Sequence, residues 1–353
     1  MKKTHFLIQL FIILIISFNG ELYSQEIEII SGDETRTFKI NIPEDTNEPL
    51  PLIILMHGLG ETNSNMYSLA NYFSNRNFIA VRPQSGSYLN SSGSGYTTLW
   101  NALADTQKLD DVQFVSDLID YMLINYDFAD HNRVYAAGYS NGGYMAYRLS
   151  CDLSNRITAF GSVAGNMYLI DDEIDCTDQR RNIPIIHIHG TGDTFNPYYP
   201  GGYGVFGDDI IGDQYLTIGE SIDFWSEYHQ YNTIEIDTIL SDVSIKYTYS
   251  NDSLSSKFVH IKAENGGHIW FYGENWGFSS TQEILDFASQ YKLSDFIVNV
   301  EDTNNDGLFN VDDVDMVIDS IFESELNNML YDFNFDQNID LFDILILSDI
   351  IFF

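Results

Sequence analysis

Positively charged residues are scarce in this chain. Lysine and arginine together number 16 among 353 residues, against 52 aspartate and glutamate residues, and the formal net charge is −36 at pH 7. A nucleic-acid backbone is bound by clustered lysine and arginine, and an anionic membrane surface attracts basic segments. The charge balance therefore argues against nucleic acid as a partner and disfavours anionic membrane surfaces.

Long hydrophobic runs are absent after the N-terminus. Lys2 and Lys3 precede an apolar run, residues 6–18, which is shorter than the roughly 20 residues that a membrane-spanning helix needs. Small and polar residues follow as far as Ser24, which is typical of a secretory signal peptide. We expect residues 1–24 to be cleaved, leaving a secreted protein (extracellular, periplasmic or at the cell surface) without a membrane span. The alternative is a short membrane anchor.

Cysteine is nearly absent, and Cys151 and Cys176 are the only pair. An exported chain can oxidise its thiols, so we expect these two residues to form a structural disulfide. Closing a loop of about 25 residues stabilises a fold by about 3 kcal/mol in the chain-entropy estimate.

The remaining composition is that of a folded protein. Hydrophobic residues make up 44% of the chain, enough for a sizeable core. Between residues 26 and 292, near-continuous apolar runs alternate with stretches of helical periodicity. This alternation predicts an α/β fold, with a mostly parallel sheet, helices on both faces, and functional groups at the carboxyl ends of the strands. The expected strands include residues 50–58, 133–138 and 183–190, and the expected helices are residues 111–126, 141–153, 220–228 and 281–291.

The pentapeptide GYSNG, residues 138–142, lies between an expected strand and an expected helix. It matches G-x-S-x-G, the nucleophile elbow, in which small residues two before and two after the serine let strand and helix approach closely. The pattern predicts that Ser140 is a nucleophile at the tip of a sharp turn. The alternative is an ordinary glycine-rich turn.

A serine nucleophile needs a base and an orienting acid, and behind such an elbow the chain order is Ser, then Asp or Glu, then His. Asp193 follows an expected buried strand in HIHGTGD, and His268 lies in the glycine-rich NGGH. We expect Ser140, Asp193 and His268 to form a catalytic triad. The expected oxyanion donors are the backbone N–H groups of Asn141, directly after the nucleophile, and of Leu59, in LMHGLG.

Aromatic residues flank these segments, and the sequence leaves open whether they line an acyl pocket or pack in the core. His57 is expected to shape the oxyanion turn. His187 and His189, two apart on a strand, could suggest a metal pair, but no third ligand has suitable spacing, and buried strand histidines are commoner. The pocket candidates are Trp100, Tyr139, Phe195 and Trp270.

These segments together carry a family resemblance. LMHGLG, LWN (residues 99–101), DDVQFVSDLID, RVYAAGYSNGGYMAYRLSC, HIHGTGDTFNPY and GGHIWF cover nearly all of residues 50–291. This region resembles the α/β-hydrolase esterases grouped as polyhydroxybutyrate depolymerase-like and carbohydrate esterase family 1, which include feruloyl and acetylxylan esterases. The resemblance implies Ser140 as nucleophile, Asp193 as acid and His268 as base, with no cofactor for catalysis. A cysteine that the family often has ahead of DDV is missing here.

Residues 301–353 form a different unit, with fourteen acidic residues and no lysine or arginine. Two twelve-residue segments, starting at Asp302 and Asp332, repeat with a period of 30, and each precedes an apolar stripe of helical spacing. Twelve-residue calcium loops place oxygen ligands at positions 1, 3, 5, 7, 9 and 12. We expect two Ca²⁺ ions, one held by Asp302, Asn304, Asp306, the carbonyl of Leu308, Asn310 and Asp313, the other by Asp332, Asn334, Asp336, the carbonyl of Asn338, Asp340 and Asp343.

Aspartate at position 12 of each loop resembles dockerin type I modules, which pair two loop–helix calcium motifs. The resemblance implies a cohesin-type scaffold as a partner, although the residues at positions 10 and 11 depart from the Ser/Thr pairs common in cohesin-binding dockerins. Gln337 stands where the second loop should have glycine, which weakens that loop. The alternative is a calcium-stapled cap or attachment module.

Chelation tests the calcium assignment. Because no positive side chain offsets the carboxylates of residues 301–353, this unit is expected to fold only with metal. EDTA should lower the helical circular-dichroism signal and make the C-terminal unit sensitive to protease. An unchanged signal together with unchanged protease resistance would remove the assignment.

The sequence as a whole predicts a serine esterase domain at residues 26–292, a short linker at 293–300 and the calcium module at 301–353. The expected function is secreted hydrolysis of carboxylic esters through an acyl-enzyme, on feruloyl or acetyl groups of xylan-type polysaccharides. One alternative is depolymerisation of a polyester such as polyhydroxybutyrate. Another is a non-catalytic glycan-binding or scaffold protein with an inactive hydrolase domain.

Overall fold

The computed structural model describes residues 26–89, 93–168, 181–199 and 216–296, together with positions 176 and 344. The predicted signal peptide and all twelve predicted calcium ligands lie outside the described residues. None of the described helices is long and apolar enough to cross a membrane.

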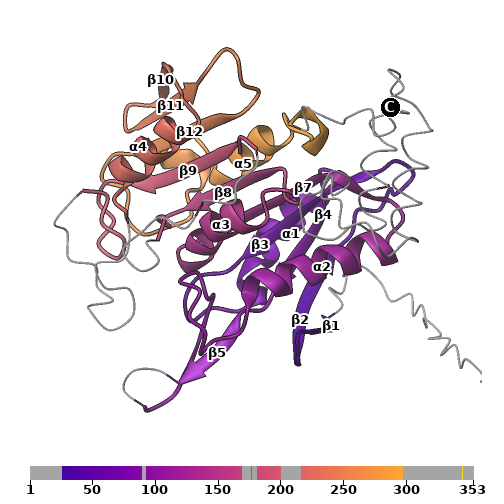
Figure 1. Cartoon of the computed structure of the whole chain (residues 1–353). Coiled ribbons are helices and arrows are strands. Elements are labelled where there is room, and N and C mark those ends of the chain that lie inside the picture. The colour runs from indigo at the N-terminus through magenta and orange to yellow at the C-terminus, as the bar shows by residue number, and fades with distance from the viewer. Residues whose placement is uncertain are drawn as a thin grey trace, which may run out of the picture.

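A ten-stranded sheet runs through the described part of the chain (Figure 1). Its central strands β4, β3, β7, β8, β9 and β12 are mutually parallel, and antiparallel strands extend it at both edges, in the order β1-β2-β4-β3-β7-β8-β9-β12-β11-β10. A separate hairpin, β5–β6, projects from one end of the molecule. The strands are β1 (Glu26–Ser31), β2 (Glu34–Asn41), β3 (Leu50–Met56), β4 (Ile79–Pro83), β5 (Gly86–Leu89), β6 (Tyr96–Leu99), β7 (Ala129–Tyr139), β8 (Ala159–Val163), β9 (Ile185–Gly190), β10 (Thr233–Ser241), β11 (Ser244–Ser250) and β12 (Lys257–Ala263).

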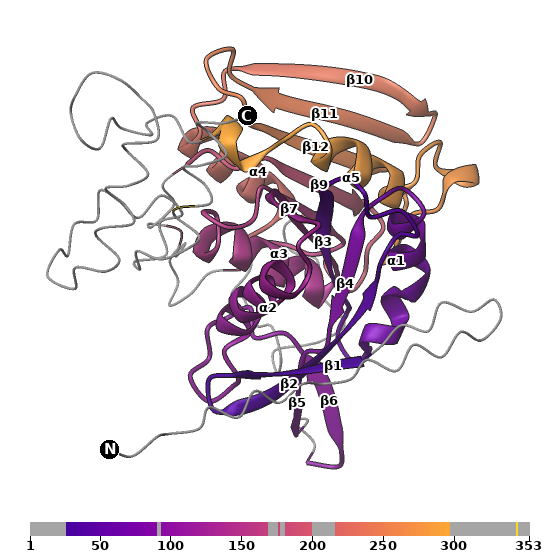
Figure 2. The ribbon, with the colours of Figure 1, turned by 90° about the vertical axis from the view of Figure 1, so that its right-hand side faces the viewer.

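Helices cover both faces of this sheet, as Figure 2 shows. Helices α2, α3 and α4 contribute to the core on one face, and α1 and α5 to the core on the other. Strand β3 shows why the arrangement suits its sequence: all seven of its residues are buried, and Leu52 and Ile54 belong to the first core while Ile53 and Leu55 belong to the second. The helices are α1 (Tyr67–Ser74), α2 (Asp111–Asn125), α3 (Asn141–Asp152), α4 (Ile218–Tyr228) and α5 (Ser280–Ala288).

The predicted mostly parallel sheet with helices on both faces is therefore confirmed. The helix starts follow local capping chemistry. The Asp110 side chain accepts the N–H of Gln113 at the start of α2, and Thr217 and Glu220 form a reciprocal capping box at the start of α4. The antiparallel edge strands were not among the expected elements.

The predicted disulfide is also confirmed. Cys151, near the end of α3, is bonded to Cys176 with their Cα atoms 4.8 Å apart, and both residues are buried. The bridge attaches the segment that follows β8 to the helix that follows the elbow.

Regular structure continues past residue 292, the predicted end of the main domain. Residues assigned to the linker form a 3₁₀ helix, Leu293–Asp295, in which Leu293 is buried. The next residue, Phe296, is buried with its ring centroid 5.9 Å from that of Tyr291. The backbone N–H of Ser294 donates to the side-chain oxygen of Asn132, 3.2 Å away. Phe296 belongs to the core that α1 and α5 cover, so the packed part of the chain extends at least to this residue.

Candidate active site

The carboxyl ends of the parallel strands bring the predicted site together, beginning with the turn between β7 and α3. Ser140 occupies this turn with φ 52°, a left-handed conformation that costs a non-glycine residue about 1–3 kcal/mol. A Cβ atom at Gly138 would overlap the carbonyl oxygen of Gly142, and one at Gly142 would overlap that of Met56. The two glycines are therefore required by the close approach of β3, β7 and α3.

The three predicted triad residues lie in one hydrogen-bonded chain. The hydroxyl Oγ of Ser140 is 2.8 Å from Nε2 of His268, and Nδ1 of His268 is 2.8 Å from Oδ2 of Asp193. Ser140 and Asp193 are buried, whereas His268 is partly exposed. With Nδ1 protonated and donating to Asp193, Nε2 of His268 is free to accept the proton of Ser140.

The carboxylate of Asp193 accepts hydrogen bonds at both oxygens. Oδ1 accepts from the backbone N–H groups of Phe195 and Asn196, at 2.8 and 2.9 Å, which forms a turn closed by the aspartate side chain. Burial alone would raise the pKa of Asp193, but hydrogen bonds from His189 and His268 outweigh it and hold that pKa well below its usual range. The carboxylate therefore stays charged.

Asn196 is a structural member of the site that the sequence did not reveal. It is buried, and its side-chain amide donates to the carbonyl of Ala164 at 2.5 Å, in the loop that follows β8. The backbone N–H of Ser140 donates to Val163, the residue before Ala164, at 2.9 Å. Asn196 thereby ties the acid's loop to the strand that supports the nucleophile. The sequence signal was the spacing D-x-x-N, which suits an aspartate-closed turn.

The two predicted oxyanion donors lie at the start of α3 and in the turn after β3. The first N–H groups of an α-helix have no acceptor within the helix, and Asn141 begins α3. In the turn after β3, Gly58 N–H donates to the Glu61 carboxylate, Gly60 N–H to the Thr98 carbonyl and Glu61 N–H to the Gly58 carbonyl. Among the described residues this leaves Leu59 as the N–H of the turn without an intramolecular acceptor.

Trp100 and His57 hold these two segments together. The Asn141 side chain accepts from the backbone N–H of Trp100 at 2.6 Å and donates to its carbonyl at 3.2 Å. The indole N–H of Trp100 donates to the carbonyl of His57 at 2.9 Å. Nδ1 of His57 donates to the Gly58 carbonyl at 2.8 Å, and its Nε2 accepts the N–H of Ser85 at 3.2 Å. Both ring nitrogens are thus used in shaping the turn.

The four predicted pocket residues divide into two pairs. Tyr139 and Phe195 contact the triad: their ring centroids lie 5.3 and 5.1 Å from that of His268, and the Tyr139 hydroxyl donates to the His268 carbonyl at 2.8 Å. Trp100 and Trp270 are core residues instead, 0% and 8% exposed. The indole N–H of Trp270 donates to Thr281. Their large apolar faces are already buried in the two cores, so these two do not line an open pocket.

Three apolar side chains in the segments that carry Asp193 and His268 are exposed, and we call them the apolar rim. Phe195, a predicted pocket residue, is 36% exposed, and Ile269 and Tyr272, which were not predicted, are 41% and 63% exposed. Burial raises the pKa of the Tyr139 hydroxyl, and the nearby Glu61, Asp193 and Tyr272 raise it further. The segments that carry the acid and the base therefore offer exposed aromatic and aliphatic surface.

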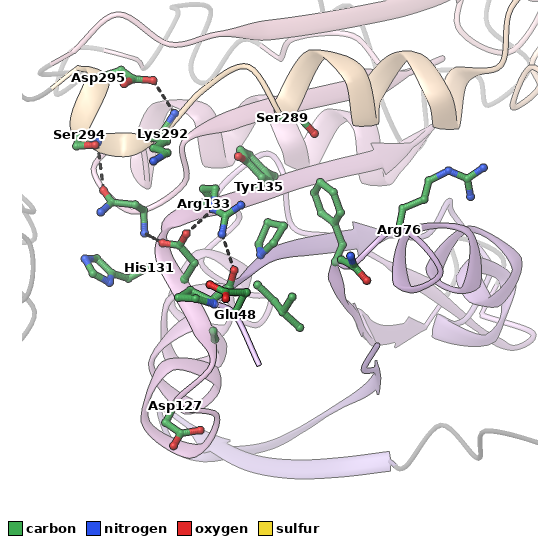
Figure 3. Close-up of a pocket in the computed structure, with 18 residues that line it drawn as sticks. Glu48, Arg76, Asp127, His131, Arg133, Tyr135, Ser289, Lys292, Ser294 and Asp295 are labelled. Atoms are coloured by element: carbon green, nitrogen blue, oxygen red, sulfur yellow. Dashed lines mark hydrogen bonds and ion pairs between the residues drawn. The ribbon is translucent and has the colours of Figure 1, made fainter. Parts of the chain in front are cut away.

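A groove of about 1000 Å³ lies at the amino ends of the parallel strands, opposite the ends that carry the triad (Figure 3). It is lined by the amino ends of β3 and β7 and by the residues after α5, and charged side chains of both signs surround it, among them Glu48, Arg133 and Lys292. None of the triad residues lines this groove. Because reacting groups of parallel sheets gather at the carboxyl ends, we assign no catalytic role to it.

Four buried histidines of the fold are held in the neutral form. Burial lowers the pKa of His57 to about 4 and the pKa values of His229 and His260 to about 3. Burial, with the nearby His189 and His260, lowers the pKa of His187 well below the ordinary value of 6.5. In the unfolded chain these groups bind protons near pH 6.5, so acid favours unfolding.

We therefore expect the free energy of unfolding to decrease as the pH is lowered. Each of these histidines lowers the free energy of unfolding by about 1.4 kcal/mol between pH 7.5 and 5.5, because its side chain binds a proton in the unfolded state and not in the folded state. The four together give a loss of about 5 kcal/mol. Urea unfolding at several pH values, in high salt to screen the net charge, measures it.

A His229→Gln variant is the control for this pH dependence. It removes one titrating group and should reduce the difference between pH 7.5 and 5.5 by about a quarter. A free energy of unfolding that stays constant over this range would contradict the burial of neutral histidines.

Comparison with known proteins matches residues 38–202, slightly under half of the chain, to the phospholipase/carboxylesterase family. A bifunctional acetylxylan esterase/xylanase of Neocallimastix patriciarum is 28% identical over 268 residues, which cover 73% of this chain and 34% of that protein. NocK of Nocardia uniformis subsp. tsuyamanensis, a candidate esterase, is 26% identical over 181 residues, which cover 48% of this chain and 49% of that protein. The chain thus spans about a third and about half of the lengths of these relatives.

An acetyl xylan esterase from Aspergillus awamori has a similar structure, with a TM-score of 0.50 and 14% sequence identity. The match covers 75% of this chain and 99% of that one. At this identity the likeness concerns the fold alone. It identifies the described domain as an α/β-hydrolase fold, in agreement with the expectation from the sequence.

Proposed function

We propose that this protein is a serine carboxylic-ester hydrolase and that Ser140 is its nucleophile. The observation that carries the proposal is the continuous hydrogen-bonded chain from Ser140 through His268 to Asp193, at the carboxyl ends of the parallel strands. The sequence similarity to the phospholipase/carboxylesterase family, over a stretch that includes Ser140 and Asp193, supports it.

The proposed mechanism proceeds through an acyl-enzyme. His268 takes the proton of Ser140 at Nε2 as Oγ attacks the ester carbonyl, and the N–H groups of Asn141 and Leu59 stabilise the oxyanion. His268 then protonates the departing alcohol. In the second half, His268 takes a proton from water as the water oxygen attacks the acyl carbonyl, and it returns that proton to Oγ of Ser140 as the bond to the acyl group breaks and the acid is released. Asp193 keeps the proton of His268 at Nδ1 in both halves and stabilises the imidazolium.

We further propose acetyl esters of xylan-type polysaccharides as the substrate. One sequence relative is named an acetylxylan esterase/xylanase, which supports this class over a free small ester. The rim of Phe195, Ile269 and Tyr272 offers flat apolar surface, on which the faces of sugar rings pack favourably. Trp100 and Trp270, two of the predicted pocket residues, are buried in the core and so do not extend an acyl pocket. A small acyl group suits such a site.

A substrate panel tests the proposal. Initial rates are measured on p-nitrophenyl acetate, acetylated xylan, methyl ferulate and polyhydroxybutyrate. We expect hydrolysis of p-nitrophenyl acetate and the highest kcat/KM for acetylated xylan. Activity confined to polyhydroxybutyrate would move the substrate to polyesters, and no hydrolysis of any of the four by folded protein would contradict the esterase proposal.

A further inference from the structure

Two histidine rings approach the same oxygen of the Asp193 carboxylate. Its Oδ2 accepts from Nδ1 of His268 at 2.8 Å, and Nε2 of His189, on β9, lies 3.3 Å from the same oxygen. His189 is fully buried, and its Nε2 also lies 2.8 Å from the backbone carbonyl of Asn196. One N–H group of His189 is therefore shared between the acid of the triad and the loop that carries it.

The contacts continue away from the triad through buried polar groups. Nδ1 of His189 is 3.1 Å from Nε2 of His187, and the two rings are stacked with an interplanar angle of 8°. Nδ1 of His187 is 2.5 Å from the hydroxyl of Tyr147, on α3. His187 is fully buried and Tyr147 is 2% exposed. We call Tyr147, His187 and His189 the buried relay.

The carbonyl of Asn196 fixes the direction of every hydrogen bond in the buried relay. A carbonyl can only accept, so Nε2 of His189 carries the proton. In a neutral ring Nδ1 of His189 is then an acceptor, and His187 must donate to it from Nε2. Nδ1 of His187 is in turn an acceptor, which leaves Tyr147 to donate its hydroxyl proton.

Charge supports the same assignment. Burial and the neighbouring His189 and His260 keep the pKa of His187 well below its ordinary value, so its ring is neutral. Nδ1 of His260 contacts the carbonyl of His187 at 3.2 Å and its Nε2 accepts from Tyr198 at 2.8 Å, so His260 adds no proton to the relay. All donors of the relay therefore point toward Asp193.

We propose that His189 is a positioning residue for Asp193, and that His187 and Tyr147 hold it in the Nε2-protonated tautomer that the role requires. The inference rests on the proposed esterase function. In it, Asp193 has to hold the ring of His268 in one orientation while that ring becomes charged. A second ring N–H on Oδ2 prevents the carboxylate from rotating and supports its negative charge.

Two amide replacements separate this role from simple packing. Gln at position 189 places an amide N–H where Nε2 of histidine lies, whereas Asn reaches only as far as Nδ1. His189→Asn should lower kcat tenfold to a hundredfold with KM within about twofold, because a hydrogen bond to a charged group is lost. His189→Gln should restore most of that loss. The remote buried histidine variant His229→Gln should have the kcat of the wild type.

Nitrogen-15 NMR of histidine-labelled protein gives an independent reading of the tautomers. His187 and His189 should both carry a proton at Nε2, and Nδ1 of each should be an acceptor. Protonation of His189 at Nδ1, or equal kcat values for the Asn and Gln variants, would overturn the inference.

The outcomes distinguish the inference from the proposed function. If Ser140→Ala abolishes hydrolysis but His189→Asn has the wild-type kcat, the buried relay is structural only and the esterase proposal stands. If Ser140→Ala is as active as the wild type, the esterase proposal fails whatever the tautomers are.

Discussion

Replacing Ser140 by alanine is expected to lower kcat for p-nitrophenyl acetate by at least about 10⁴-fold. The substitution removes the one hydroxyl that lies 2.8 Å from Nε2 of His268, and with it the acyl-enzyme route. Binding and the oxyanion donors persist, so the residual rate should exceed that of water alone while KM changes little. The measurement is a steady-state kcat on purified variant and wild type.

Ser289→Ala is the matched control for this variant. Ser289 is an exposed serine at the end of α5 that lines the groove at the amino ends of the parallel strands. Its loss should leave kcat within about twofold of the wild type. A Ser140→Ala protein that keeps full activity would show that the reaction takes place elsewhere on the molecule.

Replacing Asp193 by asparagine should cost about 10⁴-fold in kcat. Each oxygen of Asp193 faces N–H donors: two backbone groups at Oδ1, and the rings of His268 and His189 at Oδ2. Asparagine has only one side-chain oxygen, so on one side its NH₂ group faces N–H donors and cannot accept a hydrogen bond from them. The ring of His268 then turns or takes the Nε2-protonated tautomer, in which it cannot accept the proton of Ser140.

The control for this variant is Asp286→Asn, an exposed aspartate on α5. It should leave kcat unchanged, and both variants should unfold cooperatively, as the wild type does. An Asp193→Asn enzyme within about tenfold of the wild type would contradict the role given to the acid.

The sequence predicted the elements that depend on local pattern. Three features depend only on residues close together in the sequence, and the structure agrees with the prediction for each. They are the seven consecutive buried residues of β3, the glycines around Ser140 and the spacing of the predicted helices. The single cysteine pair left one disulfide to form. The chain order of Ser140, Asp193 and His268 sufficed to nominate three residues that the fold brings within hydrogen-bond distance.

The features that were missed depend on long-range packing. Whether an aromatic near the triad lies at the surface or in the core depends on its long-range packing. The sequence left both open for Trp100 and Trp270, which lie in the two cores. Phe296 looked like a linker residue, although it belongs to a core that includes residues as distant in sequence as Ile53. The contact between His189 and Asp193 forms because the loop after β9 folds back onto that strand. The presence of two histidines in a strand does not predict such a loop conformation.

The measurement that tests the central claim most directly is covalent labelling with a fluorophosphonate, which reacts with activated serines. Peptide mapping by mass spectrometry identifies the labelled residue, and hydrolysis is followed in the same sample. We expect one adduct per molecule, on Ser140, with activity lost in proportion to labelling and no adduct in Ser140→Ala. A folded wild-type protein that hydrolyses esters with Ser140 unlabelled, or that carries the adduct on another serine, would contradict it.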